Sequence, residues 1–355
     1  MTASVNMPTI PRQDRLDPET AVALYRDADL LTLGQMAQQV RFRLNPDPMV
    51  TYAIDRNINY TNICTSRCAF CAFWRAGNHP EAYVMDQDLL ARKCDETRAL
   101  GGTHILYQGG LNPDLDLQWH EEQIRLIRQR GLNVHGYSPP EIVHMARQSG
   151  LSVRTVITRL MEAGLGSIPG GGAEILVDRV RLKVSPGKAS AGQWLSVMRT
   201  AHELGLRTTA TMMFGHIESD EERIEHIFAI RGLQDQTGGF TAFIPWPYQP
   251  GKRTILGRAA GGTTYLRTLA ISRLILDNVP HIQASWVTQG KQIGQVALHF
   301  GADDIGSTMI EENVVSSAGV SMPPSGLPAP EMVRLIEAAG FQAEQRNVLY
   351  EPVPN

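Results

Sequence analysis

Short apolar runs alternate with longer amphipathic segments between residues 50 and 309. Runs rich in β-branched and aromatic residues predict strands at 50–60, 103–107, 133–137, 165–169, 207–214, 240–245, 282–287 and 304–309. Segments whose apolar residues recur at helical spacing predict helices at 86–100, 118–130, 140–163 (broken near Gly150), 190–204, 219–236, 262–278 and 289–299. Strands and helices that alternate in this way indicate an α/β protein with a parallel sheet.

The number of units favours a closed barrel. Eight strand–helix units at 49–315 suit a (βα)8 barrel of the TIM type, and an open doubly wound sheet is the alternative. An N-terminal helical extension is predicted at 1–48, because residues 18–44 show helical spacing before two prolines. A C-terminal helical tail is predicted at 316–355, beginning with a Pro-, Ser- and Gly-rich linker at 316–330.

The composition argues against several classes of protein. With 355 residues, 43% of them hydrophobic, the chain can bury a large core. A formal net charge of -3 and the lack of any Lys/Arg run argue against a nucleic-acid partner. No stretch reaches the roughly 20 apolar residues of a membrane span, and the first residues show no apolar secretory signal. We therefore expect a cytoplasmic protein without a membrane span.

Three of the four cysteines lie close together, in the sequence CTSRCAFC at 64–71. This C-x3-C-x2-C array falls in a predicted loop after the first strand. A structural zinc ion usually takes four protein ligands, so a zinc site would need a further ligand such as His79. Three thiolates could instead bind three irons of a 4Fe-4S cluster and leave the fourth iron open. Three unrelated buried cysteines are the remaining alternative, which the tight spacing disfavours.

The cysteine loop resembles the cluster loop of the radical S-adenosylmethionine (SAM) superfamily. The resemblance implies that Cys64, Cys68 and Cys71 bind three irons of one 4Fe-4S cluster, and that SAM chelates the fourth. It also implies that an electron from the cluster cleaves SAM to a 5′-deoxyadenosyl radical, which abstracts hydrogen from a substrate. Phe70 and its apolar neighbours would shield the cluster from water.

A second motif of the superfamily, a glycine-rich segment after the second strand that contacts SAM, is matched by QGGL at 108–111. Leu111 replaces the acidic residue that often follows the glycines, and a tight turn is the alternative interpretation. After the fourth strand, related enzymes place a carboxylate that binds SAM, and two arginines nearby could bind the SAM carboxylate or lie on a solvated helix. The candidate SAM-binding residues are Gln108, Gly109, Gly110, Glu174, Arg179 and Arg181.

The resemblance extends over residues 20–350, in segments such as NINYTNICTSRCAFCAFWR, TGGFTAFIPWPYQP and GSTMIEENVV. These segments are similar to a radical SAM family of the futalosine route to menaquinone, the cyclases that form cyclic dehypoxanthine futalosine. The resemblance implies that dehypoxanthine futalosine is the substrate, and that an external one-electron donor such as flavodoxin or ferredoxin reduces the cluster. Aminofutalosine synthases and deazaflavin (F420) synthase subunits are alternatives in the same superfamily. A zinc-stabilised barrel hydrolase is the alternative from another class.

The implied reaction removes hydrogen from the ribose C4′, closes a ring on the benzoate and then needs a proton acceptor. The substrate's carboxylate, hydroxyls and aromatic ring call for a cation, hydrogen-bonding groups and an aromatic face. Candidate substrate-binding residues are Arg56, Arg75, Trp246, Gln249, Trp286, Thr288 and Gln289. Candidate catalytic proton acceptors are Asp55, Tyr60, His216 and Glu311. Each also has a structural alternative, since tryptophans in strands usually pack in the core and arginines often pair with surface carboxylates.

Overall fold

The structure is a computed structural model that describes residues 15–251, 259–319 and 326–354. Its strands are β1 (Met49–Ala53), β2 (Asp55–Asn59), β3 (His104–Gln108), β4 (Asn133–Gly136), β5 (Leu165–Ser167), β6 (Thr208–Phe214), β7 (Phe240–Pro247), β8 (His281–Ile282), β9 (Asp304–Ser307) and β10 (Gln342–Gln345). The predicted linker lies partly outside the described residues, at 320–325.

The helices follow the strands along the chain. They are α1 (Pro18–Asp27), α2 (Leu30–Leu44), α3 (Gln87–Ala99), α4 (Leu117–Gln129), α5 (Pro139–Ser149), α6 (Val153–Ala163), α7 (Asp178–Val184), α8 (Ala191–Glu203), α9 (Asp220–Thr237), α10 (Gly262–Ile275), α11 (Trp286–Ala297), α12 (Val314–Ser317) and α13 (Ala329–Ala338). None of the helices in the described ranges has the length and apolar character that crossing a membrane requires.

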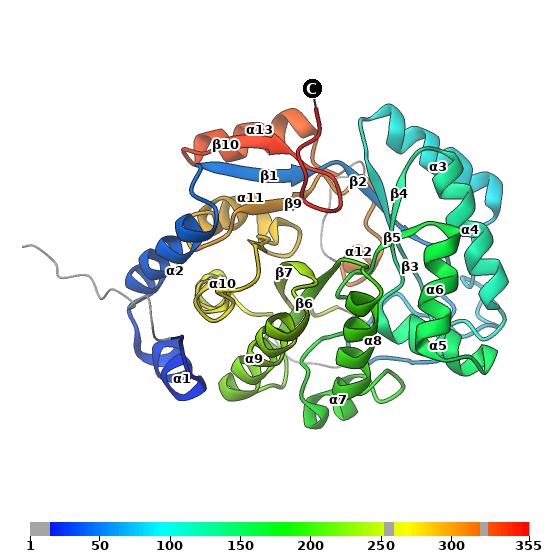
Figure 1. Ribbon diagram of the computed structural model, residues 1–355, viewed down its shortest axis with the longest axis horizontal. Coiled ribbons are helices and arrows are strands. Elements are labelled where there is room, and N and C mark those ends of the chain that lie inside the picture. Colours follow the sequence, from blue (N-terminus) through cyan, green and yellow to red (C-terminus); the bar gives the residue numbers. More distant parts are fainter. Residues whose placement is uncertain (1–14, 252–258, 320–325, 355) are drawn as a thin grey trace, which may run out of the picture.

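Parallel pairing closes the strands into a barrel, which confirms the predicted (βα)8 class. The ladder β2-β3-β4-β5 joins β6-β7-β8 through a bridge between Ile168 and Thr208. A bridge between Gln283 and Asp304 joins β8 to β9, and β9 pairs with β1. Helices surround the barrel, and the apolar residues between the two layers form the core (Figure 1).

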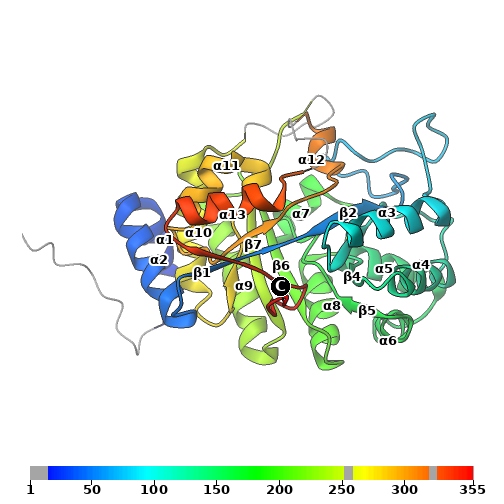
Figure 2. The same ribbon diagram turned by 90° about the horizontal axis from the view of Figure 1, so that it is seen from above.

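β1 and β2 are two halves of one strand that changes partners at Ile54. β1 pairs with β9 on one side and with β10 on the other, whereas β2 pairs with β3. β10 comes from the C-terminal tail and lies beside β1, with α13 next to it (Figures 1 and 2). The tail is therefore not purely helical as predicted, because its segment after α13 adds a strand to the barrel sheet.

Two other predicted elements differ from the structure. The helix expected at 18–44 is broken into α1 and α2, because Asp29 begins a new helix by accepting a hydrogen bond from the Thr32 N–H at 3.0 Å. The strand expected at 282–287 ends at Ile282, and α11 begins at Trp286. The apolar residues of the predicted strand, such as Ala284 and Trp286, are still buried, but they lie before and at the start of α11.

Candidate active site

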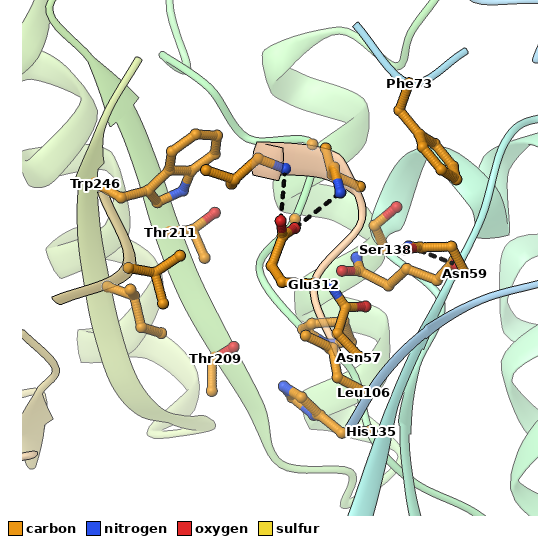
Figure 3. Close-up of a pocket in the computed structure, with 18 of the residues that line it drawn as sticks. Asn57, Asn59, Phe73, Leu106, His135, Ser138, Thr209, Thr211, Trp246 and Glu312 are labelled. Carbon is orange, nitrogen blue, oxygen red and sulfur yellow. Dashed lines mark hydrogen bonds between the residues drawn. The ribbon is translucent and has the colours of Figure 1, made fainter. Parts of the chain in front are cut away.

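A cavity of about 390 Å³ lies inside the barrel, between the cysteine loop and the C-terminal tail. Its wall consists of side chains from the strands and from the loops that follow them (Figure 3). The candidate residues that line it are Asp55, Cys64, Cys68, Phe70, Cys71, Gln108, Gly109, Gly110, Glu174, Trp246, Trp286 and Thr288. The barrel thus brings together residues from most of the segments that the sequence analysis singled out.

The cysteine loop follows β2 and is held by backbone hydrogen bonds to distant segments. The Cys64 N–H donates to the Arg75 carbonyl at 3.1 Å, and the Ala69 N–H donates to the Val184 carbonyl at 2.8 Å. Arg67 has a φ of 49°, in the left-handed region that residues other than glycine rarely adopt. With this backbone path, all three cysteines of the loop line the cavity.

The three thiols suit a cluster better than a single metal ion. They form no disulfide, and burial raises the pKa of Cys68 to about 11 and also raises the pKa of Cys71. Within the described part of the chain, no three His, Cys, Asp or Glu side chains converge as ligands of one ion would. Sulfurs that bind separate irons of a cluster need not converge, so this geometry disfavours one zinc ion held by the cysteines and His79.

The glycines of the second motif pack directly against the start of the cysteine loop. A Cβ on Gly109 would lie 2.6 Å from the Tyr60 ring, and a Cβ on Gly110 would lie 2.1 Å from the Ile63 carbonyl oxygen. The Gly110 N–H donates to the Thr61 carbonyl at 3.0 Å. Both positions therefore require glycine for contact between the two loops, whatever contact they make with SAM.

A buried carboxylate that the sequence analysis missed joins the same two loops. Glu141 in α5 accepts hydrogen bonds from the Tyr60 hydroxyl at 2.7 Å, the Gly109 N–H at 3.0 Å and the Ser138 N–H at 2.8 Å. Burial raises the pKa of Glu141 in spite of these bonds, and burial holds the pKa of Tyr60 well above its usual value. Tyr60 is thus a hydrogen-bond donor to Glu141 and does not line the cavity.

Glu174 forms a buried ion pair with Lys188 beside the cysteines. The Lys188 Nζ lies 2.7 Å from the Glu174 Oε1, and the two side chains are 18% and 3% exposed. Burial opposes ionisation of Glu174, but the charges of Lys188 and Arg181 hold its pKa below the usual value. Burial also opposes the charge on Lys188, but Cys68 and Glu174 raise its pKa. Lys188 lies in a loop without a motif, so no sequence signal identified it.

The two arginines proposed for SAM do not line the cavity. Arg179 pairs with Glu222 at 2.5 Å, and its side chain is 49% exposed. Arg181 is buried and donates to the carbonyls of Ala189 at 3.0 Å and Gly172 at 3.1 Å, so it braces the loop that carries the ion pair. Lys188 is therefore the cation that the structure brings to the cysteines.

Below the cysteine loop, strand register arranges the interior side chains in tiers. The Asp55 Oδ2 lies 3.1 Å from the His104 Nε2. Burial opposes ionisation of Asp55, but its hydrogen bond with His104 and the charge on His104 hold its pKa below the usual value. The lower, middle and upper tiers are Asp55 with His104, Asn57 with Leu106 and His135, and Asn59 with Gln108.

Two of the candidate proton acceptors are paired outside the cavity. The His216 Nε2 donates to the Met213 carbonyl at 3.0 Å, the His216 Nδ1 lies 3.2 Å from Glu218, and burial lowers the pKa of His216. Glu311 lies 2.5 Å from the Lys93 Nζ. Neither side chain lines the cavity, so their positions do not support the role that the sequence suggested.

The neighbour of Glu311 lines the cavity instead. The Glu312 carboxylate accepts hydrogen bonds from the N–H groups of Val314 at 2.9 Å and Val315 at 2.8 Å, and Figure 3 shows it in the middle of the cavity. Burial raises the pKa of Glu312. The sequence could not separate these adjacent glutamates, because the choice depends on how the loop after β9 turns.

Three candidate substrate-binding residues line the cavity. Trp246 lies at the end of β7 and Trp286 at the start of α11, where its Nε1 donates to the Ser307 carbonyl at 2.9 Å. The Thr288 Oγ1 is 2.7 Å from the Ser285 Oγ. Two indole faces and two hydroxyls are thus available to an aromatic, oxygen-rich ligand.

The other candidate substrate-binding residues do not line the cavity. Arg56 donates to Glu96 at 2.8 Å, and Arg75 donates to Glu81 at 2.7 Å. Arg56 is therefore bound to α3, and Arg75 is bound to the segment that follows the cysteines. The residues in this group are Arg56, Arg75, Gln249 and Gln289.

Comparison with known sequences identifies the family. The radical SAM superfamily matches residues 58–230, and the CofH/MqnC C-terminal region matches residues 237–355. The cyclic dehypoxanthine futalosine synthases of Streptomyces coelicolor and Halalkalibacterium halodurans are 47% and 44% identical to this chain, over 95% of it and over 85% and 91% of their own lengths. The aminodeoxyfutalosine synthase of Thermus thermophilus is 40% identical, over 96% of this chain and 92% of the relative.

A solved structure supports the fold. Methylornithine synthase (PylB) matches with a TM-score of 0.75 at 16% identity, over 93% of this chain and 95% of that one. The superfamily implies a 4Fe-4S cluster and SAM, and the free cysteines beside the cavity fit that requirement. The chain therefore belongs to the radical SAM superfamily of enzymes, in a family that includes the cyclic dehypoxanthine futalosine synthases, the aminodeoxyfutalosine synthases and the 5-amino-6-(D-ribitylamino)uracil–L-tyrosine 4-hydroxyphenyl transferases.

Proposed function

We propose that this enzyme converts dehypoxanthine futalosine to cyclic dehypoxanthine futalosine in menaquinone biosynthesis. The observation that carries the proposal is the 44–47% identity to two relatives of that name, against 40% to aminodeoxyfutalosine synthase. In the proposed reaction the ribose C4′ loses a hydrogen atom and attacks the benzoate ring. Loss of one electron to a one-electron acceptor, a role that the oxidised cluster would fill when bound, and loss of one proton to a base then restore the aromatic ring.

At the cofactor end of the cavity, Cys64, Cys68 and Cys71 are the proposed ligands of three cluster irons. When bound, the cluster and SAM supply a one-electron cleavage that yields the hydrogen-abstracting 5′-deoxyadenosyl radical, with the electron coming from a donor such as flavodoxin or ferredoxin. Lys188 and Glu174 carry opposite charges beside these cysteines. They suit the carboxylate and amino groups of a methionyl ligand, because charge-assisted hydrogen bonds are strong in a water-poor site.

The rest of the chain orients the substrate and excludes water. Phe70, Phe73 and Trp74 line the cavity around the cysteines and keep solvent from the reacting carbon. Trp246 and Trp286 offer faces to the benzoate ring. Orientation matters most here, since a hydrogen-abstracting centre reacts with the nearest suitable C–H bond.

The proposed proton acceptor is a carboxylate that lines the cavity. Asp55, Glu141, Glu174 and Glu312 line it, but Glu141 is held by the Tyr60 hydroxyl and the Gly109 and Ser138 N–H groups, and Glu174 is paired with Lys188, which leaves Asp55 and Glu312. The pKa of Asp55 is held low by His104, whereas burial raises the pKa of Glu312 toward the range of an effective general base. Glu312 is therefore the better candidate, in place of the adjacent Glu311.

The test uses the reconstituted, chemically reduced enzyme with SAM and dehypoxanthine futalosine carrying deuterium at C4′. The expected result is a cyclised product together with 5′-deoxyadenosine that contains the deuterium. A matched reaction offers 5-amino-6-(D-ribitylamino)uracil and L-tyrosine, the pair named for relatives that are 36–40% identical. Consumption of that pair without any cyclised futalosine product would refute the proposal.

A further inference from the structure

We propose that the polar groups of the middle tier of the cavity, Asn57 and His135, bind the ribose hydroxyls of the substrate and not its benzoate carboxylate. This inference rests on the proposed function and adds which part of the substrate the middle tier recognises. It starts from two buried polar atoms that have no hydrogen-bond partner in the structure.

These two atoms are the Asn57 Oδ1 and the His135 Nδ1. Asn57 is 7% exposed, and both residues line the cavity. An unpartnered buried polar atom destabilises the folded protein, so protein interiors rarely keep one without a use. Both atoms belong to side chains that line the same cavity, so a ligand with hydrogen-bonding groups would satisfy them.

The two side chains lie at the same level of the barrel. Asn57 of β2 is the register partner of Leu106 in β3, and Leu106 is the register partner of His135 in β4. In Figure 3 these three side chains lie together on one wall of the cavity, and Thr209 of β6 lies on the other. Thr209 also lines the cavity, so a hydroxylated ring between the walls would meet polar groups on both sides.

The charges around the tier disfavour a carboxylate there. Below it, Asp55 is paired with His104 at 3.1 Å. Arg346 binds Asp304 through two hydrogen bonds, of 2.5 and 3.0 Å, so its charge is balanced. Among the described residues that line the cavity, the only lysine or arginine besides Arg346 is Lys188, which is paired with Glu174. An anion at the middle tier would therefore meet carboxylates without a free cation.

Neutral hydroxyls fit the same surroundings. An amide and a neutral imidazole each carry both a hydrogen-bond donor and a hydrogen-bond acceptor. A sugar hydroxyl can donate to one of these groups and accept from another. Burial lowers the pKa of His135 to about 3, which keeps its ring neutral near pH 7. The middle tier lies two residues below the upper tier, about 7 Å along the strand, so a ribose held there lies between the lower tier and the cysteine loop.

The test compares substrate analogues on variants of the reduced holoenzyme with SAM. The analogues are 2′-deoxy and 3′-deoxy dehypoxanthine futalosine and one that lacks the benzoate carboxylate. The variants are Asn57→Leu and His135→Phe, which remove the polar atoms with little change of volume. Ile58→Val is the matched control, because Ile58 lies on the same strand, is fully buried and does not line the cavity.

We expect the wild type to prefer the parent over at least one deoxy analogue by about tenfold or more in kcat/KM, since the missing hydroxyl leaves buried groups unpaired. The ratio of kcat/KM for the parent substrate to kcat/KM for the deoxy analogue should fall toward one in Asn57→Leu or His135→Phe. It should stay unchanged in Ile58→Val. A ratio measured within one variant does not depend on how much of it folds, and each of the two variants tests the proposal separately. Variants that lose only the preference for the carboxylate, or lose neither preference, would overturn the inference. A wild type that does not cyclise the parent substrate would instead overturn the proposed function.

Discussion

The two ends of the cavity are built in different ways. Beside the cysteine loop, the wall comes from contiguous stretches of chain, CTSRCAFC and QGG, that are locked together by Glu141 and by glycine packing. In the interior, single side chains from neighbouring strands meet because their strands are in register. The first end carries a charged pair and thiols, whereas the second carries neutral polar groups that lack partners, above the Asp55–His104 pair.

This difference separates chemistry from recognition. The thiols and the Lys188–Glu174 pair are suited to a charged cofactor, which shares its needs with a whole superfamily. The tiers are suited to a particular shape and pattern of hydroxyls, which is what distinguishes one substrate from another. Substitutions at the cysteine end should therefore impair cluster binding and SAM cleavage, whereas substitutions in the interior should change substrate preference or stability.

The largest effect is expected at the cysteine loop. Replacing Cys64, Cys68 or Cys71 with Ala should abolish SAM cleavage, because a cluster that lacks a protein ligand is not held in place. Iron content and 5′-deoxyadenosine formation measure the outcome. Cys94→Ala is the control, since Cys94 is buried in α3 outside the cavity and should keep activity at a cost of about 1–2 kcal/mol in stability. A Cys94→Ala enzyme without iron would show that the ligand set is different.

A smaller but still large effect is expected at the ion pair. Lys188→Met should raise the KM for SAM by about 10- to 100-fold, because a charge-assisted hydrogen bond is worth about 1.5–3 kcal/mol. The variant's melting temperature shows whether loss of the partner of Glu174 also destabilises the fold. Lys183→Met, an exposed lysine on α7, is the matched control and should leave the KM unchanged. An unchanged KM in Lys188→Met would remove the charged pair from the SAM site.

In the lower tier, the Asp55–His104 pair should contribute to the free energy of unfolding, and this contribution should depend on pH. Asp55→Asn should lower the free energy of unfolding by about 1–3 kcal/mol at pH 7, because His104 loses a charged acceptor. The folded-state pKa of Asp55 lies below its usual value, so the ionised carboxylate stabilises the fold above that value. The difference between wild type and variant should shrink as the pH falls below about 4 through the folded pKa. Urea unfolding at several pH values measures it, and a difference that grows on acidification would contradict the assignment.

The smallest effect is expected at Arg179. The sequence suggested that this residue contacts SAM, but in the structure it forms an exposed ion pair with Glu222. Arg179→Met should change the KM for SAM by less than about twofold, because exposed ion pairs contribute little. Steady-state kinetics on the variant measure it. A large rise in KM would mean that α7 moves its exposed face toward the cavity when SAM binds.

Much of the fold could be predicted from the sequence, because strand and helix periods differ and the barrel repeats them eight times. The cysteine loop was found for a similar reason, since its ligands are neighbours in the chain. Lys188, Glu141 and Glu312 were missed, because each acts through a loop or a helix start whose direction no local pattern fixes. Whether the predicted cysteines bind the cluster remains a prediction for the experiments above.

The candidate arginines were predicted to bind ligands but do not line the cavity. Arg56, Arg75, Arg179 and Arg181 have the right charge, yet each is engaged by a carboxylate or by carbonyls. Charge type is visible in a sequence, but the partner of a charge depends on long-range packing. The middle tier could not be predicted from the sequence either, because Asn57 and His135 are brought together only by the register of β2, β3 and β4.

The pairing of β1 with β9 and β10 has a consequence for how the chain reaches this structure. β1 lies early in the chain, and both of its partners lie near the other end. Contacts between such distant segments form slowly, because a long loop must close before they can stabilise anything. Until then both edges of β1 are open to pairing with other chains, which is a route to aggregation. We expect the yield of active enzyme to depend on protein concentration during refolding, with dilution favouring the barrel over intermolecular sheets.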